Sequence, residues 1–255
     1  LGAFTKYPRK SILDKKSGHI KDKKYGFFHS QNTFFDEVAN ELGMVDSNGE
    51  YMRHPLAYLV EAADDICYTL IDFEDGINLG WISEEYALEF LIRLVKDSID
   101  TKKYNSLKHK TDRVAYLRAL SVNTLINDTV KIFLANEEKI LNGQFTKTLL
   151  SESVFKAQMK DIIDISVRKV YNSKEVIEKE LKGYQVIHKL LSVFIKASVN
   201  NQSDNTTALD DLVLSSLPQA YIHKDGNLYD QLLDISCFVA SLTDGNALEW
   251  YNKIS

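Results

Sequence analysis

Residues 61–75 read EAADDICYTLIDFED, a stretch that is too apolar for a loop and yet is rich in carboxylates. Its apolar residues recur at helical spacing, which predicts that the stretch lies inside a helix. In a helix with about 3.6 residues per turn, Asp64, Tyr68 and Asp72 follow one another along a single face. The stretch therefore predicts a helix with a stripe of carboxylate, phenol and carboxylate along one side.

Two explanations of this stripe stay open at the level of the sequence. An amphipathic helix normally turns its charged residues toward solvent, so a solvated face is the ordinary explanation. Aspartate, however, is unfavourable inside a helix because its short side chain competes for backbone hydrogen bonds, and the adjacent Asp64 and Asp65 repel each other. A bound cation, or the hydroxyl groups of a ligand, would offset both effects, so the stripe is a candidate binding site.

The composition favours a globular, helical protein. The chain has 255 residues, of which 44% are hydrophobic, and its three prolines and eleven glycines leave long uninterrupted segments. No apolar run approaches the ~20 residues of a membrane-spanning helix, and the first residues lack the pattern of a signal peptide. We therefore expect a cytoplasmic protein without membrane contact. The net charge of -5 argues against a surface that binds nucleic acid globally, although it allows a local basic pocket.

Apolar spacing and capping residues predict an all-α fold of many helices, with no strand pair. Pro55 suits the first turn of the central helix, and Gly80 ends it. A glycine inside a helix often marks close packing, which we expect at Gly183. The expected helices run over residues 30–43, 55–80, 83–95, 112–143 (as one helix or two in tandem), 151–170 with Ser151 as the cap, 173–194, 209–217, 227–242 and a last turn after Thr243.

We expect a single helical unit over residues 1–255. Within it, residues 1–29 form a basic loop region, residues 30–100 contain the helices that carry the site, and residues 101–255 contain the remaining helices. Residues 200–207 have the composition of a linker.

Few other chemistries are available in this sequence. Cys67 and Cys237 lie in apolar helical patterns, which predicts buried free thiols rather than a disulfide. No two of the six histidines have the spacing that places a metal-binding pair on one helix face, and phosphate loops and nucleophile elbows are absent.

The basic residues at positions 6–24 form either a solvated terminus or a loop that binds anions. Together with the stripe, they suggest a cation and an anion in one site. A metal-bound phosphate ester is the simplest ligand that would use both.

The run HPLAYLVEAADDICY at residues 54–68, followed by DFED at residues 72–75, closely resembles the deoxyguanosine triphosphate triphosphohydrolases, which are HD-domain hydrolases. The resemblance extends in the same order over essentially the whole chain. It implies an HD-domain-like helical fold and the metal-dependent hydrolysis of a deoxynucleoside triphosphate, dGTP or another, to a deoxynucleoside and tripolyphosphate. The other segments that resemble the family are residues 5–10, 24–28, 117–118, 122–125, 181–187 and 242–244.

The resemblance also implies roles for single residues. Asp64 corresponds to a ligand of a divalent metal such as Mg²⁺ or Mn²⁺. Tyr68 corresponds to the aromatic residue that packs on the deoxyribose and blocks a ribose hydroxyl, and Asp72 to the acceptor for the 3′-hydroxyl. Three further residues fall where the family contacts the triphosphate: Lys6, Tyr7 and Lys24.

Other carboxylates of the stretch have ordinary explanations. Asp65 is the nearest competitor of Asp64 as a ligand, about 100° further round the helix. For Asp65, Glu74 and Asp75 we expect capping, ion pairing or solvation.

The chain departs from the family pattern at its start. The family's other metal ligands, a histidine and a His-Asp pair, would precede Leu1, so the resemblance implies the C-terminal portion of a larger enzyme. We therefore expect this chain alone to contain no catalytic residue and to be inactive. The alternative is a non-catalytic nucleotide-binding or regulatory helical subunit.

Substrate choice and partners are expected from the resemblance alone. Some members carry arginines near the base where this chain has Gln231 and Leu233, so guanine selectivity is not implied. Family members assemble into hexamers, which implies a homo-oligomer here, and a single-stranded DNA partner is known in the family.

Overall fold

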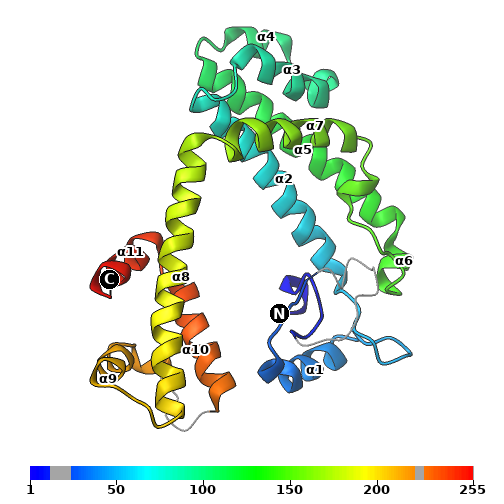
Figure 1. Cartoon of the computed structure of the whole chain (residues 1–255). Coiled ribbons are helices and arrows are strands. Elements are labelled where there is room, and N and C mark those ends of the chain that lie inside the picture. The colour runs from blue at the N-terminus through cyan, green and yellow to red at the C-terminus, as the bar shows by residue number, and fades with distance from the viewer. Residues whose placement is uncertain (12–23, 222–226, 255) are drawn as a thin grey trace. The chain divides into compact units, whose positions relative to one another are not determined.

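The computed structural model describes residues 1–11, 24–221 and 227–254. Across these residues the fold is all-α, as the sequence predicts, and β-structure is limited to the isolated bridges Lys10–Phe27 and Val45–Tyr51. The chain divides into two compact units, Leu1–Ser173 and Lys174–Ser255 (Figure 1). The smaller segments expected from the sequence stay a prediction.

The first unit contains seven α-helices within its described residues. They are α1 (Asn32–Glu41), α2 (Pro55–Asn78), α3 (Glu84–Val95), α4 (Thr101–Ser106), α5 (Lys110–Ala135), α6 (Glu137–Leu141) and α7 (Lys156–Ser166). Short turns connect them, namely the 3₁₀ turns η1 (Gly2–Phe4), η3 (His29–Gln31), η4 (Lys96–Ser98) and η5 (Leu150–Glu152), and the π-helical turn η6 (Val167–Tyr171).

Helix α2 has the bounds that its end residues predict. Pro55 occupies the first helical position, and the His54 side chain accepts a hydrogen bond from the Leu56 backbone N–H at 3.2 Å. At the other end Gly80 adopts φ +78°, a conformation that L-residues rarely take, so the chain can turn away there. Both ends are thus set by local sequence.

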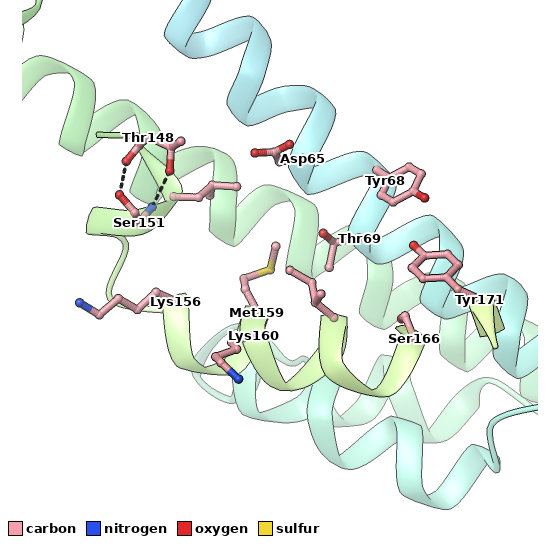
Figure 2. Close-up of a pocket in the computed structure, with 12 residues that line it drawn as sticks. Asp65, Tyr68, Thr69, Thr148, Ser151, Lys156, Met159, Lys160, Ser166 and Tyr171 are labelled. Carbon is pink, nitrogen blue, oxygen red and sulfur yellow. Dashed lines mark hydrogen bonds between the residues drawn. The ribbon is translucent and has the colours of Figure 1, made fainter. Parts of the chain in front are cut away.

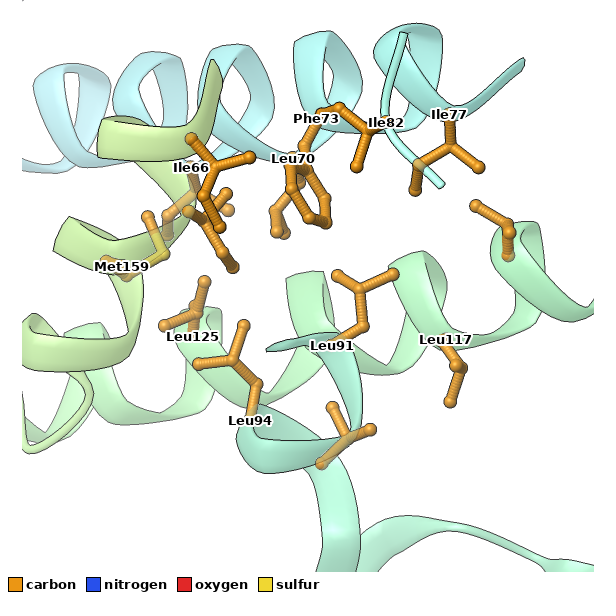
Figure 3. Close-up of a cluster of buried hydrophobic side chains, with 14 of the residues drawn as sticks. Ile66, Leu70, Phe73, Ile77, Ile82, Leu91, Leu94, Leu117, Leu125 and Met159 are labelled. Atoms are coloured by element: carbon orange, nitrogen blue, oxygen red, sulfur yellow. The ribbon is translucent and has the colours of Figure 1, made fainter. Parts of the chain in front are cut away.

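The core of the first unit forms where α2 packs on α5 and α7, and where α3 packs on α5 and α7. Figure 3 shows the buried side of α2 facing the leucines of α3 and α5, with Met159 of α7 beside them. The opposite side of α2 carries exposed residues and is not part of this core. The labelled core residues are Ile66, Leu70, Phe73, Ile77, Ile82, Leu91, Leu94, Leu117, Leu125 and Met159.

The second unit is built on one long helix. It contains α8 (Lys174–Gln202), α9 (Ala208–Ser215), the 3₁₀ turn η7 (Gln219–Tyr221), α10 (Leu228–Ser241) and α11 (Asp244–Lys253). Helices α9, α10 and α11 each pack against α8. Phe194, Phe238 and Trp250 meet edge to face in the middle of its core, with ring centroids 5.3–5.8 Å apart.

Several boundaries differ from the expectation. Helix α7 begins at Lys156, so Ser151 does not cap it. The Ser151 hydroxyl instead donates to the Thr148 carbonyl at 2.7 Å within η5, while Ser153 accepts from the Phe155 backbone N–H at 3.0 Å. The segment 112–143 forms the tandem pair α5 and α6, which was one of the two possibilities.

The connection in the second unit is shorter than the linker composition suggests. Helix α8 continues through Gln202, and Thr207 already caps α9 through a reciprocal capping box with Asp210. A methyl group at Gly183 would meet no atom within 4 Å, so the close packing expected there is not found in the described part of the chain.

Both cysteines are free, as predicted, but both are exposed rather than buried. Each lies next to a buried residue, Ile66 or Phe238, and one helical step of about 100° carries it off the apolar face. Among the described residues no helix has the length and apolar character needed to cross a bilayer.

Candidate functional site

The predicted stripe lies on the side of α2 that faces away from the core. Asp64 is exposed, Tyr68 is 60% exposed and Asp72 is half-buried, whereas Ile66 and Leu70 on the opposite side are buried. The structure therefore places the carboxylate, the phenol and the carboxylate on one accessible face. What each of them binds stays a prediction.

Tyr171 joins this stripe from another element. Its hydroxyl donates a hydrogen bond to the Asp72 carboxylate, and its ring stacks on Tyr68 with centroids 6.0 Å apart and planes inclined by 26°. Burial, the Asp72 carboxylate and the neighbouring Tyr68 hydroxyl together raise the pKa of Tyr171, so its phenol remains a proton donor. Asp72 and Tyr68 are thus held by a third residue.

The π-helical turn η6 positions Tyr171. The Asn172 backbone N–H bonds to the Val167 carbonyl five residues earlier at 3.1 Å, which widens the last turn after α7. Val170 of this turn packs closely on Gly76 of α2. A methyl group at Gly76 would lie only 2.6 Å from a Val170 methyl carbon. The absence of a side chain at Gly76 therefore lets η6 approach α2.

A buried cluster of charges anchors the N-terminal segment to α2. Buried Glu61 accepts from the Arg53 guanidinium at 2.7 Å and pairs with the Lys6 ammonium at 3.2 Å. Burial alone would lower the pKa of Lys6, but the charge and hydrogen bond of Glu61, with the charge of Asp65, outweigh burial and raise it. The cluster thus combines two cations with the Glu61 carboxylate, and the Asp65 carboxylate also acts on Lys6.

The Arg53 guanidinium also lies over the Tyr58 ring, 4.2 Å from its centroid. The Tyr58 hydroxyl donates to the Phe145 carbonyl at 2.6 Å, and burial is the main cause that raises the pKa of Tyr58. Two Arg53 nitrogens, Nε and Nη1, are buried without a hydrogen-bond partner among the described residues. Arg53 is therefore fixed by a charge and a ring rather than by a full set of acceptors.

The other two predicted phosphate contacts, Tyr7 and Lys24, make no ion pair with α2 among the described residues. Tyr7 is half-buried, with the Lys6 ammonium 5.7 Å from its ring centroid. Lys24 is exposed, and no hydrogen bond or ion pair links it to the stripe within the described ranges. The two basic segments touch at Gly26. A methyl group there would lie 1.9 Å from the Tyr7 carbonyl oxygen, so only glycine allows this contact. Residues 12–23 of the predicted basic region lie outside the described residues.

A pocket of about 430 Å³ opens beside the stripe, with walls from α2, η5, α7 and η6 (Figure 2). Figure 2 shows Met159 projecting from α7 toward α2, and the Lys156 and Lys160 ammonium groups directed away from α2. The pocket therefore has an apolar floor and a polar edge. Its lining residues are Asp65, Tyr68, Thr69, Thr148, Leu150, Ser151, Lys156, Met159, Lys160, Ile163, Ser166 and Tyr171.

One polar atom of this pocket has no partner. The Ser166 hydroxyl is buried in the wall and makes no hydrogen bond within the described part of the chain. Unpaired buried hydroxyls are unfavourable, and this one is covered by its neighbours. Tyr68 and Tyr171 belong both to the stripe and to this pocket, so one ligand can contact both.

The described residues do not by themselves fit a divalent metal. No group of three or more histidine, cysteine, aspartate and glutamate side chains comes together among them. A catalytic metal needs about three protein ligands, and the exposed Asp64 supplies one. No step of the chemistry is therefore derived through a metal held by these residues alone.

Curated relatives align with the chain from end to end. A Synechocystis protein named deoxyguanosinetriphosphate triphosphohydrolase-like protein is 30% identical over 261 residues, covering 100% of this chain and 58% of its own length. A Pseudomonas aeruginosa protein of the same name is 30% identical over 263 residues, covering 100% of this chain and 59% of its own length. The chain is homologous to the triphosphohydrolase-like proteins. The resemblance seen in the sequence is thereby confirmed.

A Serratia proteamaculans protein named deoxyguanosinetriphosphate triphosphohydrolase is 30% identical over 188 residues, covering 68% of this chain and 36% of its own length. No family model matches the chain. The chain spans less than two thirds of the triphosphohydrolase-like proteins that it matches. The activity and partners of the whole protein are therefore matters for proposal.

Three residues of this candidate site do not follow from the sequence pattern. Glu61, Arg53 and Tyr171 were not singled out, although the first two lie within or beside the motif. Glu61 falls on the apolar side of the predicted helix, and a charged residue is rarely buried there unless it is paired. That position is the signal in the sequence for a buried ion pair at Glu61. Nothing in the local sequence pairs Tyr171 with Asp72.

Proposed function

We propose that the intact protein hydrolyses a deoxynucleoside triphosphate to a deoxynucleoside and tripolyphosphate, and that the stripe on α2 is the wall that receives the sugar. The observation that carries this proposal is the geometry of the stripe: Asp64, Tyr68 and Asp72 share an accessible face beside a pocket. A purely solvated face would not need the tyrosine contacts that hold Asp72 and Tyr68.

The sugar fits the middle of the stripe. The exposed Tyr68 ring offers a flat apolar surface on which a deoxyribose can pack. We propose that the same ring excludes an additional ribose hydroxyl. The Asp72 carboxylate can accept a hydrogen bond from the 3′-hydroxyl, a charge-assisted bond of the stronger kind. Selection for a deoxynucleotide would follow from these two side chains.

The triphosphate fits the positive cluster near the start of α2. A triphosphate carries about four negative charges and requires cations for its recognition. The Lys6 ammonium is held by Glu61 next to α2, and the Lys6 side chain remains 33% exposed, so a phosphate can reach it. We propose Lys6, with Tyr7 and Lys24, as phosphate contacts.

In the reaction, water attacks the α-phosphorus and the bond from that phosphorus to the 5′-oxygen breaks. The 5′-oxygen takes a proton and leaves as the deoxynucleoside, while the three phosphates leave as tripolyphosphate. Asp64 would supply one ligand to a divalent cation such as Mg²⁺ or Mn²⁺, with further ligands from outside the described residues. The contribution of this chain is to bind and orient the nucleotide.

The base fits the pocket behind Tyr68 and Tyr171. Its floor of Leu150, Met159 and Ile163 suits a flat aromatic ring. No arginine of the described chain lines this pocket. We therefore propose no preference for guanine over other bases.

The test is the product pattern of the intact protein. Each deoxynucleoside triphosphate is supplied alone and in mixtures with a divalent cation, and tripolyphosphate and deoxynucleoside are separated by ion-exchange chromatography. The proposal expects the two products in equal amounts. Nucleotide binding without turnover under every mixture would instead support a regulatory nucleotide-binding subunit.

Assembly and partners extend the same proposal. We propose a homo-oligomer, a hexamer by resemblance, which sedimentation equilibrium of the intact protein would reveal. A single-stranded DNA partner stays a prediction from the same resemblance, and a cytoplasmic location stays a prediction from the composition.

A further inference from the structure

Tyr171 borders the pocket of the proposed function, and it also contacts both residues that would receive the sugar. Its hydroxyl donates to Asp72 Oδ2, and its ring stacks on Tyr68 at 6.0 Å. Both contacts come from the turn η6. Tyr171 and Asp72 are 99 residues apart in the sequence. Such a bridge fixes two side chains of the stripe relative to each other.

The support of Tyr171 is itself rigid. Val170, immediately before it, is 7% exposed and belongs to the main core of the first unit. The same residue sits against Gly76, one helical turn beyond Asp72 on α2. The backbone at Tyr171 is therefore held close to α2 by the core contact of Val170.

The hydrogen bond also determines which part of Asp72 is available. Because Oδ2 accepts from Tyr171, rotation of the carboxylate is restrained. Among the described residues no hydrogen bond to Oδ1 is found, so this oxygen remains for a ligand. A preorganised acceptor binds a hydroxyl more tightly than one that must first be ordered.

We propose that Tyr171 is a positioning residue that holds the Asp72 carboxylate and the Tyr68 ring in the arrangement that recognises the 3′-hydroxyl of a deoxynucleotide. This inference rests on the proposed function, because it takes the sugar to lie on the stripe. Tyr171 acts through Asp72 and does not itself touch the reacting phosphorus.

The experiment compares Tyr171→Phe with the unaltered intact protein, using a deoxynucleoside triphosphate and its 2′,3′-dideoxy analogue. KM and kcat are measured for turnover, and equilibrium binding is measured by calorimetry. We expect Tyr171→Phe to raise KM and Kd for the deoxynucleotide about five- to tenfold, since one charge-assisted hydrogen bond no longer orients Asp72. The dideoxy analogue has no 3′-hydroxyl to lose, so its Kd should change less than about twofold.

Tyr116→Phe is the matched control. The Tyr116 hydroxyl in α5 accepts from the Asp100 backbone N–H at 3.1 Å, away from the stripe, so the substitution removes a hydrogen-bonded hydroxyl from another half-buried tyrosine. This variant should bind both nucleotides like the unaltered protein.

Each outcome is decisive. Equal weakening of both nucleotides by Tyr171→Phe, or no weakening of either, would overturn the positioning role. If the intact protein binds both nucleotides but cleaves neither, the proposed hydrolase function fails, while the difference in Kd still decides the role of Tyr171. Absence of binding to the unaltered protein would refute both.

Discussion

Glu61 is the residue that ties the N-terminal segment to α2. It is buried, and it meets Arg53 at 2.7 Å and Lys6 at 3.2 Å. Removing the carboxylate would leave the Arg53 guanidinium buried without a counter-charge, which is among the more costly single changes in a folded protein. The cluster is therefore both a structural anchor and, in the proposed function, the support of a phosphate contact.

We predict that Glu61→Ala lowers the free energy of unfolding by about 3 kcal/mol, as measured by urea denaturation. Glu89→Ala is the control, because it breaks an Arg–Glu pair whose two side chains are both more than half exposed. That change should alter the free energy of unfolding by less than about 1 kcal/mol. Equal effects of the two substitutions would contradict the burial argument.

Tyr51 makes a second test possible through pH. Its hydroxyl donates to Asp36, and its ring packs edge to face with Phe27 and Phe35. Burial first, and then the Asp36 carboxylate, raise the pKa of Tyr51 from 10.0 to about 12. Because the folded pKa lies above the unfolded value, this stabilisation is complete below pH 10 and is lost as the pH rises toward 12.

We predict that Tyr51→Phe flattens the fall in the free energy of unfolding between pH 10 and 12. Urea denaturation at several pH values in that range measures the effect. The exposed Tyr86, substituted to Phe, should leave the fall unchanged. An equally steep fall in the Tyr51 variant would show that other groups cause it.

At the scale of elements, two glycines inside helices behave in opposite ways. A methyl group at Gly76 of α2 would lie 2.6 Å from Val170 and 2.9 Å from Ile82, whereas one at Gly183 of α8 meets nothing within 4 Å. Close approach of α2 and η6 explains the first glycine. The second carries only the entropic penalty of glycine in a helix.

We predict that Gly76→Ala lowers the free energy of unfolding by about 1–3 kcal/mol, because it overpacks the contact between α2 and η6. Gly183→Ala should raise it, by up to about 1 kcal/mol. Urea denaturation again measures both. The double variant Gly76→Ala with Val170→Ala should lose less free energy of unfolding than the sum of the two single variants, because the smaller side chain relieves the clash. A loss equal to that sum would contradict the proposed clash.

The predictability of these elements follows the range of the interactions that define them. The bounds of α2 depend on Pro55 and Gly80, which act on their own backbone, and they were predicted. The start of α7 was not, because the Ser151 hydroxyl bonds within a short turn before the helix, and α7 begins at Lys156 without a side-chain cap. Exposure of Cys67 was missed for a similar reason, since one helical step separates the core from solvent.

The same distinction applies to the candidate site. The stripe follows from a spacing of four residues, which any helix places on one face. Tyr171 is far from Asp72 in sequence, and only the packing of η6 on α2 brings them together. Sequence therefore predicts one side of the site, while the residues that hold it in place require the structure.

At the scale of the whole molecule, α2 contributes both to the core of the first unit and to its candidate site. Its inner side forms the main core, and its outer side carries the stripe and borders the pocket. A rigid helix is a suitable support for a site whose residues must be held accurately. In the proposed function, α2 is one wall of the nucleotide site, with further metal ligands from outside the described residues.

The most direct test of this account is the rate of tripolyphosphate release by the intact protein carrying Asp64→Ala, compared with Asp75→Ala. Both aspartates are exposed on α2, and only Asp64 belongs to the stripe. We predict that Asp64→Ala lowers kcat on the order of 100-fold or more, because a ligand of the proposed catalytic cation is lost. We predict that Asp75→Ala changes kcat less than about twofold. An Asp64→Ala protein that releases tripolyphosphate as fast as the Asp75→Ala protein would contradict this account.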